Sequence, residues 1–263
     1  MNRLGLLLAQ AAAFWPVAHW YAASTRSASP ERWQLVALAA CALFVLARLD
    51  RPRESRSLAG PACLLLVYAL AQHRLPSLAA GLLAVLSLTW TASLLYTSRR
   101  LHAGLLGLGL LALPVVPLFQ AHLGFPLRLV TARASSGMLR FAGFDVEARG
   151  TCLDWGGALV QVDGPCSGLA MLWTTWLVTC VAATLWRLGN AGTLAGILLA
   201  SLLVVAANAL RACALLFVES GQVALPAWGH AGVGLVVQAL VAGSVLAFLH
   251  SRSRVPCAPS VST

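Results

Sequence analysis

The chain contains no lysine, and all 18 of its cationic side chains are arginine. Charge of either sign is scarce: 10% of the residues are charged and 59% are hydrophobic. A soluble domain is about a quarter charged, so this composition excludes a soluble globular protein. A chain that cannot hide its apolar surface in water is predicted to be a polytopic membrane protein.

The formal net charge of +10 does not indicate a nucleic-acid partner. The arginines stand in short clusters between apolar runs, as at 48–56 and 99–100. Charges at such places set the orientation of membrane helices. The predicted surroundings are therefore a lipid bilayer, with no nucleic acid among the partners.

Apolar runs long enough to cross a bilayer occur eight times. A crossing helix needs about 20 residues, with a range of about 17 to 25. The first run lacks a small-residue cleavage site and is predicted to be a span rather than a signal peptide. We therefore predict an all-α polytopic membrane protein of about eight transmembrane helices. They are expected at 4–23, 32–49, 58–74, 76–97, 103–121, 167–186, 192–215 and 230–250.

The distribution of arginine predicts the orientation of these spans. With the N-terminus inside, the cytoplasmic segments carry ten arginines and two acidic residues, a net charge of +8. The outer segments then carry eight arginines and six acidic residues, a net charge of +2. Positive charge favours the cytoplasmic side, so both termini are predicted to be cytoplasmic in a multi-pass protein of the inner (plasma) membrane.

Four segments follow from this orientation. Residues 1–121 form five N-terminal spans, 122–165 an extracytoplasmic β-like segment, 166–250 three C-terminal spans, and 251–263 a cytoplasmic tail. Within the outer segment, "FDVEARGTCLDWGGALVQVDG" alternates apolar and polar residues around Gly150 and the pair Gly156-Gly157. Such alternation between glycine turns predicts a small β-hairpin or meander.

Three reactive residues far apart in the sequence are predicted to share the outer face. Cys166 opens the sixth span, Arg211 lies late in the seventh, and His230 opens the eighth. A thiol at a helix start lies at the positive end of the helix dipole, which favours the nucleophilic thiolate. Thiol, guanidinium and imidazole together are the parts of a cysteine acyl-transfer site, and no cofactor is predicted.

Each residue of this candidate site has a predicted role. His230 can pass protons between the thiol, the leaving amine and the incoming nucleophile. Arg211 can stabilise an oxyanion or bind a carboxylate. Asn208 precedes Arg211 by three residues on the same helix face and can orient it or bind substrate. Ser167 and Gly168 allow close approach of a substrate and offer backbone amides to an oxyanion.

Other interpretations of these residues stay open. Cys166 can be a packing residue, one half of a disulfide with Cys152, or a zinc ligand beside Cys152 and His230. No CxxC or HxxxH spacing supports a zinc site, so no metal is predicted. Arg211 lies near the end of its span and can extend into water. A non-catalytic membrane transporter or assembly subunit is the alternative function, although the polar residues gather at one face.

The ordered segments "GPCSGLAMLW", "NALRACALL" and "HAGVG" resemble the exosortase/archaeosortase family of membrane transpeptidases. The resemblance covers about residues 115–250. It implies a cysteine protease or transpeptidase that acts on membrane-anchored proteins with a C-terminal sorting signal. That signal is a motif such as Pro-Glu-Pro, a membrane span and a basic tail. Cys166 would form a thioester with the substrate, which then passes to an acceptor amine or to water.

The resemblance also implies that an outer arginine can bind the glutamate of such a motif. Arg140 and Arg149 are the predicted substrate-binding arginines, with Arg128 and Arg133 as further candidates in the same outer segment.

Overall fold

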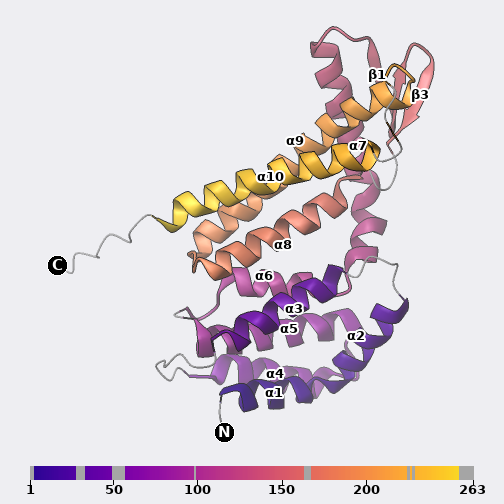
Figure 1. Cartoon of the computed structure of the whole chain (residues 1–263). Coiled ribbons are helices and arrows are strands. Elements are labelled where there is room, and N and C mark those ends of the chain that lie inside the picture. The colour runs from indigo at the N-terminus through magenta and orange to yellow at the C-terminus, as the bar shows by residue number, and fades with distance from the viewer. Residues whose placement is uncertain are drawn as a thin grey trace, which may run out of the picture. The chain divides into compact units, whose positions relative to one another are not determined.

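The protein was analysed as a computed structural model, which describes residues 3–27, 33–48, 57–97, 99–162, 167–223, 226 and 229–254. The described chain is mostly helical and includes one small antiparallel sheet (Figure 1). The elements in chain order are α1 (Arg3–Ala13), α2 (Trp15–Ser27), α3 (Trp33–Leu46), α4 (Ala59–Ala71), α5 (Ser77–Tyr96), α6 (Ala103–Leu111), α7 (Val116–Phe141), β1 (Val146–Arg149), β2 (Cys152–Trp155), β3 (Ala158–Gln161), α8 (Leu169–Leu185), α9 (Asn190–Glu219) and α10 (Gly229–Ser253).

The chain divides into two compact units. The first unit consists of residues 1–115 and 180–194, and the second consists of residues 116–179 and 195–263. The second unit thus holds α7, the sheet, the first part of α8, most of α9, and α10. The predicted site segments all fall in this second unit.

Helices of the first unit are joined by buried polar side chains as well as by apolar packing. The amide of Gln10 donates to the hydroxyl of Ser87 at 2.7 Å, and that hydroxyl donates to the carbonyl of Pro61 at 3.0 Å. These bonds tie α1, α5 and α4 together. The ring of Phe14, between α1 and α2, lies 4.7 Å from the ring of Tyr68 on α4, and both belong to one apolar core of this unit.

The predicted β-meander is confirmed. Strands β1, β2 and β3 pair antiparallel in that order, with Val146 opposite Trp155 and Leu153 opposite Val160. Gly156 and Gly157 both have positive φ, as a two-residue hairpin turn requires, and this favours glycine. The inward side chains pack on helices of the second unit in a cluster of Ala132, Leu139, Val146, Leu153, Val162 and Leu216.

The count of eight membrane spans is not confirmed. Among the described residues, three helices are long and apolar enough to cross a membrane, namely 77–96, 190–219 and 231–253. A fourth is obtained if α6 and α7 are taken as one broken span. The remaining apolar helices are shorter, at 3–13, 33–46, 59–71 and 169–185.

Two predicted spans are interrupted close to proline residues. The run 4–23 breaks at Phe14 between α1 and α2, two residues before Pro16. The run 103–121 breaks between α6 and α7, where Pro114 stands. Proline has no N–H to continue the helical ladder, and its ring clashes with the preceding turn. In both places the apolar run is therefore longer than the continuous helix within it.

Helix α7 is the main element that the sequence did not predict. The sequence pattern predicts residues 122–141 as part of the outer β-like segment, yet they continue the helix that begins at Val116. The stretch is rich in leucine, alanine and arginine, which favour helix. Its buried hydroxyls are bonded: Ser135 donates to the carbonyl of Ala209 at 2.9 Å, and Ser136 to that of Val146 at 2.8 Å.

Candidate functional site

Two of the three predicted catalytic side chains lie outside what the structure describes. Cys166 lies outside the described residues, as do positions 163–165 before it. His230 lies in the first turn of α10, where only the backbone is described. The described residues next to them in the chain, and the residues that these contact, define the candidate site.

The Cys-Ser-Gly segment lies against α9 through its glycine. Gly168 has a φ of +78°, and a Cβ added there would stand 3.0 Å from Cγ and Nδ2 of Asn208. Any other residue would be strained in its backbone and would contact that amide so tightly that the amide would have to shift. Gly168 also accepts a hydrogen bond from the N–H of Leu172 at 2.9 Å, which begins α8. The motif glycine thus contacts the motif asparagine.

Ser167 is buried directly beside this contact. Its Oγ accepts a hydrogen bond from the N–H of Leu169, the first residue of α8, at 3.4 Å. The hydroxyl therefore caps a helix-start amide that has no partner within the helix. Cys166 precedes Ser167 by one residue, so the residue that follows it in the chain lies at the N-terminal end of α8.

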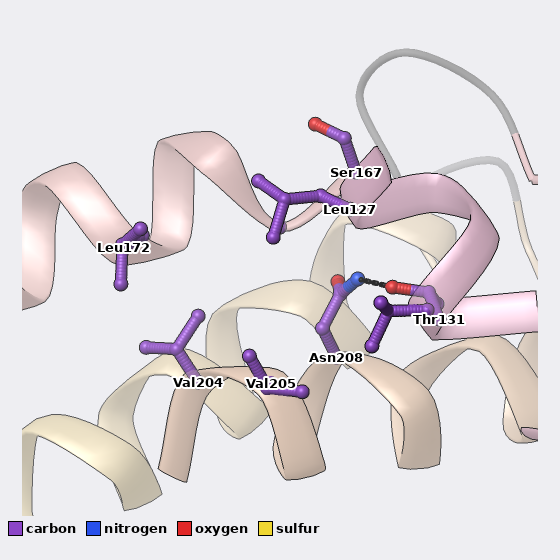
Figure 2. Close-up of a pocket in the computed structure, with 9 residues that line it drawn as sticks. Leu127, Thr131, Ser167, Leu172, Val204, Val205 and Asn208 are labelled. Carbon is purple, nitrogen blue, oxygen red and sulfur yellow. Dashed lines mark hydrogen bonds between the residues drawn. The ribbon is translucent and has the colours of Figure 1, made fainter. Parts of the chain in front are cut away.

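Asn208 is held from the other side by a residue that sequence reasoning missed. Its Nδ2 donates to Oγ1 of Thr131 on α7 at 3.0 Å, as Figure 2 shows. Asn208 is 2% exposed and Thr131 is 3% exposed, so the bond is made away from solvent. A buried amide without partners would be costly, and this bond fixes the orientation of the Asn208 side chain.

Thr131 belongs to a polar face of α7 that the sequence does display. Thr131 and Ser135 are four residues apart and so lie on one face of the helix. Both bond to consecutive residues of α9, Asn208 and Ala209. An i, i+4 pair of hydroxyl residues in a stretch predicted as helix would have pointed to this contact, but the stretch was not predicted as helix.

A small cavity lies beside these residues (Figure 2). Thr131, Ser167 and Asn208 provide its polar side chains, and Gly168 and five apolar residues complete its lining, namely Leu127, Val130, Leu172, Val204 and Val205. Its volume is about 10 Å³, which is room for a single water molecule. The arrangement holds the motif residues in place and has no space for a peptide between them.

Arg211 extends from the same α9 face toward α10. A Cβ at Gly234 would lie 3.4 Å from Nε and 3.5 Å from Cζ of Arg211, which is ordinary contact. The Nε atom is buried and has no hydrogen-bond partner among the described residues. Because position 230 lies one turn before Gly234 on the same helix face, the guanidinium lies at the turn of α10 next to His230.

The predicted substrate-binding arginines are not part of this arrangement. Arg149 is 64% exposed on β1 and pairs with Asp154 at 3.1 Å and with Glu147 at 3.7 Å. Arg140 is exposed in the last turn of α7. Neither lines the cavity beside Asn208.

The alternative metal and disulfide interpretations concern Cys152. Cys152 is half-buried on β2 opposite Gln161, and its thiol is unbridged among the described residues. No group of three His, Cys, Asp or Glu residues that could hold a metal is found in the described parts of the chain.

These features define a helical membrane protein in which a Cys-Ser-Gly segment, an Asn-x-x-Arg helix and a His-containing helix meet. The sequence model of the transmembrane exosortase family matches residues 4–247, nearly the whole chain, and the protein belongs to this family. No curated protein and no solved structure matches the chain. The resemblance seen over about 115–250 is thereby confirmed, and the match extends it into the N-terminal helices.

Proposed function

We propose that the protein is a membrane cysteine transpeptidase or protease of the exosortase type. Its substrates are membrane-anchored exported proteins, from which it cleaves a C-terminal sorting signal of the Pro-Glu-Pro kind. One observation carries the proposal: Gly168 contacts Asn208, while Arg211, one turn further along α9, contacts Gly234 beside position 230. The segments that carry Cys166, Arg211 and His230 thus meet through described residues.

The proposed reaction is acyl transfer in two steps. The Cys166 thiolate forms a C–S bond to the scissile carbonyl carbon, and the electron pair moves to the oxygen. Collapse of this oxyanion breaks the C–N bond, and the leaving amine takes a proton from the His230 imidazolium. An acceptor amine or water then attacks the thioester and gives a proton to His230. The C–S bond breaks and the Cys166 thiolate returns.

Arg211 supplies positive charge to this reaction. Its guanidinium is permanently charged and offers fixed donors to an oxyanion or a substrate carboxylate. A buried Nε with no partner among the described residues fits a group whose partner is the substrate. Asn208 positions the Cys-Ser-Gly segment on one side and precedes Arg211 by one turn on the other.

The glutamate of the sorting motif is proposed to meet an outer arginine. Arg149 shares its charge with Asp154 and Glu147, whereas no such ion pair is found for Arg140 among the described residues. Arg140 is therefore the better placed of the two for a substrate carboxylate.

We further propose that the chain crosses the inner membrane eight times with both termini cytoplasmic and the site outside. The charge difference of +8 inside against +2 outside supports this orientation. Exposed Leu159 on β3 and Arg252 at the end of α10 are suitable labelling positions. Leu159→Cys is expected to react with an impermeant thiol reagent on intact cells, and Arg252→Cys only after the membrane is opened. The reverse pattern would rule out an outer active site.

The function is tested by substituting two cysteines, with opposite expectations for each. Cys166→Ala is expected to abolish processing of the cell's sorting-signal proteins, and Cys166→Ser nearly so, because a hydroxyl is a poor nucleophile near neutral pH. Cys152→Ala is the matched control and is expected to process normally. Normal processing by Cys166→Ala at matched membrane abundance would exclude the proposed function.

A further inference from the structure

One polar side chain within the C-terminal span connects two helices of the site. Gln238 on α10 donates through Nε2 to Oγ1 of Thr174 at 2.8 Å and to Oγ1 of Thr175 at 3.2 Å, both on α8. The threonine hydroxyl protons are already used within α8. Thr174 donates to the carbonyl of Ala170 at 2.9 Å, and Thr175 to that of Met171 at 2.7 Å. Each threonine hydroxyl can therefore only accept a further hydrogen bond. A side chain that bonds to both hydroxyls must offer two donors, as the Gln238 amide does.

Gln238 lies on the inward face of α10. The face continues through Val241, Val245 and Leu249, which are buried. One turn before Gln238 stands Gly234, against which the Arg211 guanidinium lies. One turn before that is position 230, so the glutamine and the predicted catalytic histidine lie two turns apart along one side of the helix.

A glutamine at this depth is not explained by apolar packing. Polar groups in a membrane span are costly and usually face the protein interior, where they find partners. Leucine or methionine would fill the same position without needing hydrogen-bond partners. The two directional hydrogen bonds, however, fix both the rotation of α10 about its axis and its position along that axis relative to α8. A single polar residue fixes the register of a coiled coil in the same way.

We propose that Gln238 is a positioning residue that fixes α10 on α8 so that His230 faces Cys166. The inference rests on the proposed function. Helix α8 begins three residues after Cys166, and α10 begins one residue before His230. A bond between the two helices, about one and a half turns into α8 and two and a half turns into α10, therefore sets the relative position of thiol and imidazole. If α10 were shifted by one residue against α8, position 230 would be rotated by about 100° about the axis of α10.

The test is a distance-dependent cross-link that needs no substrate. His230→Cys in a chain whose other cysteines except Cys166 are replaced by serine or alanine is expected to oxidise to a disulfide with Cys166. Adding Gln238→Met, which keeps the length but removes both donors, is expected to lower the cross-linking yield at least fivefold. Ser244→Ala is the matched control, because Ser244 is exposed on α10 and bonds only to the carbonyl of Leu240 among the described residues. It should leave the yield unchanged.

The processing rate separates positioning from general stability. In the otherwise unaltered chain, Gln238→Met is expected to lower kcat about 10- to 100-fold with little change in KM, because small misplacements of reacting groups have effects of this size. Thr174→Val with Thr175→Val should give the same loss, and adding Gln238→Met should reduce the rate no further.

The outcomes distinguish this inference from the proposed function. An undiminished cross-link and rate with Gln238→Met overturn the positioning role and leave the site intact. A His230→Cys chain that does not cross-link even with Gln238 present overturns the proposed Cys166–His230 pair and this inference with it. Additive losses in the triple variant overturn the claim that Gln238 acts through the two threonines.

Discussion

Buried polar side chains in the two units have different neighbours. In the first unit, Gln10, Ser87 and the cap residue His102 bond to hydroxyls and backbone groups that have no part in the site. In the second unit, Thr131 and Asn208 bond to each other beside the Cys-Ser-Gly segment. Buried side-chain hydrogen bonds thus join helices in the first unit, whereas in the second unit they also hold the motif residue Asn208.

This difference predicts how the two units respond to substitution. Loss of a polar contact in the first unit should lower stability and leave the processing rate per folded molecule unchanged. Loss of a contact around Asn208 or Arg211 should lower the rate with the protein still folded and inserted.

Arg211→Lys is expected to lower the processing rate about 10²- to 10³-fold. Lysine keeps the charge but loses the fixed fork of donors, and losing one oxyanion donor has effects of this size. Arg187→Lys, in the exposed turn between α8 and α9, is the control and should be silent. The measurement is processing at matched membrane abundance. Full activity in Arg211→Lys would show that the donor fork of Arg211 has no part in the reaction.

Gly168→Ala is expected to lower the rate about 10²-fold. The new Cβ would stand 3.0 Å from the Asn208 amide, on a backbone with φ of +78° that alanine avoids. Gly243→Ala on α10 is the control, because nothing lies within 4 Å of a Cβ there. Thiol-reagent labelling of Cys166 in both variants reports whether the segment moved. Equal labelling and processing in the two would contradict the importance of the Gly168–Asn208 contact.

Thr131→Val is expected to lower the rate about tenfold. Valine has the shape of threonine but offers no acceptor to the Nδ2 of Asn208, so the amide loses its bond at 3.0 Å. Thr193→Val in the first unit is the matched control, since Thr193 is equally buried and bonds to the carbonyl of Gly189 at 3.1 Å. It should change the melting temperature more than the rate. A rate loss of equal size in both variants would remove the distinction between the units.

Substitution of His102 is expected to have the smallest effect on activity, together with a pH-dependent effect on stability. Burial, with the nearby charges of Arg99 and Arg48, lowers the pKa of His102 from 6.5 to about 4. The neutral ring accepts the N–H of Leu105 through Nδ1 at 3.4 Å and so caps α6. As pH falls below about 6.5, the unfolded chain takes up the proton first, so this stabilisation is present above 6.5 and is lost toward pH 4.

His102→Asn keeps a capping side chain without the titration. We expect the wild type to lose more melting temperature between pH 7 and pH 4 than this variant, with equal processing rates at pH 7. Parallel melting curves over this range would contradict the assigned role of His102.

The sequence predicted those features that depend on local patterns. Alternation around Gly150 and Gly156-Gly157 predicted the sheet, because glycine turns and period-two patterning are visible in a few residues. The order of the Cys-Ser-Gly, Asn-x-x-Arg and His segments predicted the family. Neither required knowledge of which helices pack together.

The features that the sequence missed depend on tertiary contacts. Helix α7 contains arginines and hydroxyl residues, and it resembles a polar loop until Thr131 and Ser135 are seen to bond to α9. The hydrogen bond from Asn208 to Thr131 joins residues 77 positions apart in the chain, and no local sequence pattern at either position predicts it. The broken helices at Phe14 and Pro114 were missed because hydropathy measures composition rather than helical continuity.

The proposed reaction requires that Cys166 form a thioester with the substrate. Membranes from cells that make the protein are quenched in acid, digested, and searched by mass spectrometry for a substrate peptide attached to the fragment that contains Cys166. We expect such an adduct, released by neutral hydroxylamine as a thioester should be, and absent from Cys166→Ala and from membranes without substrate. An adduct on another residue, or cleaved substrate with no adduct on Cys166 when the thioester is demonstrably preserved by the quench, would rule out Cys166 as the nucleophile.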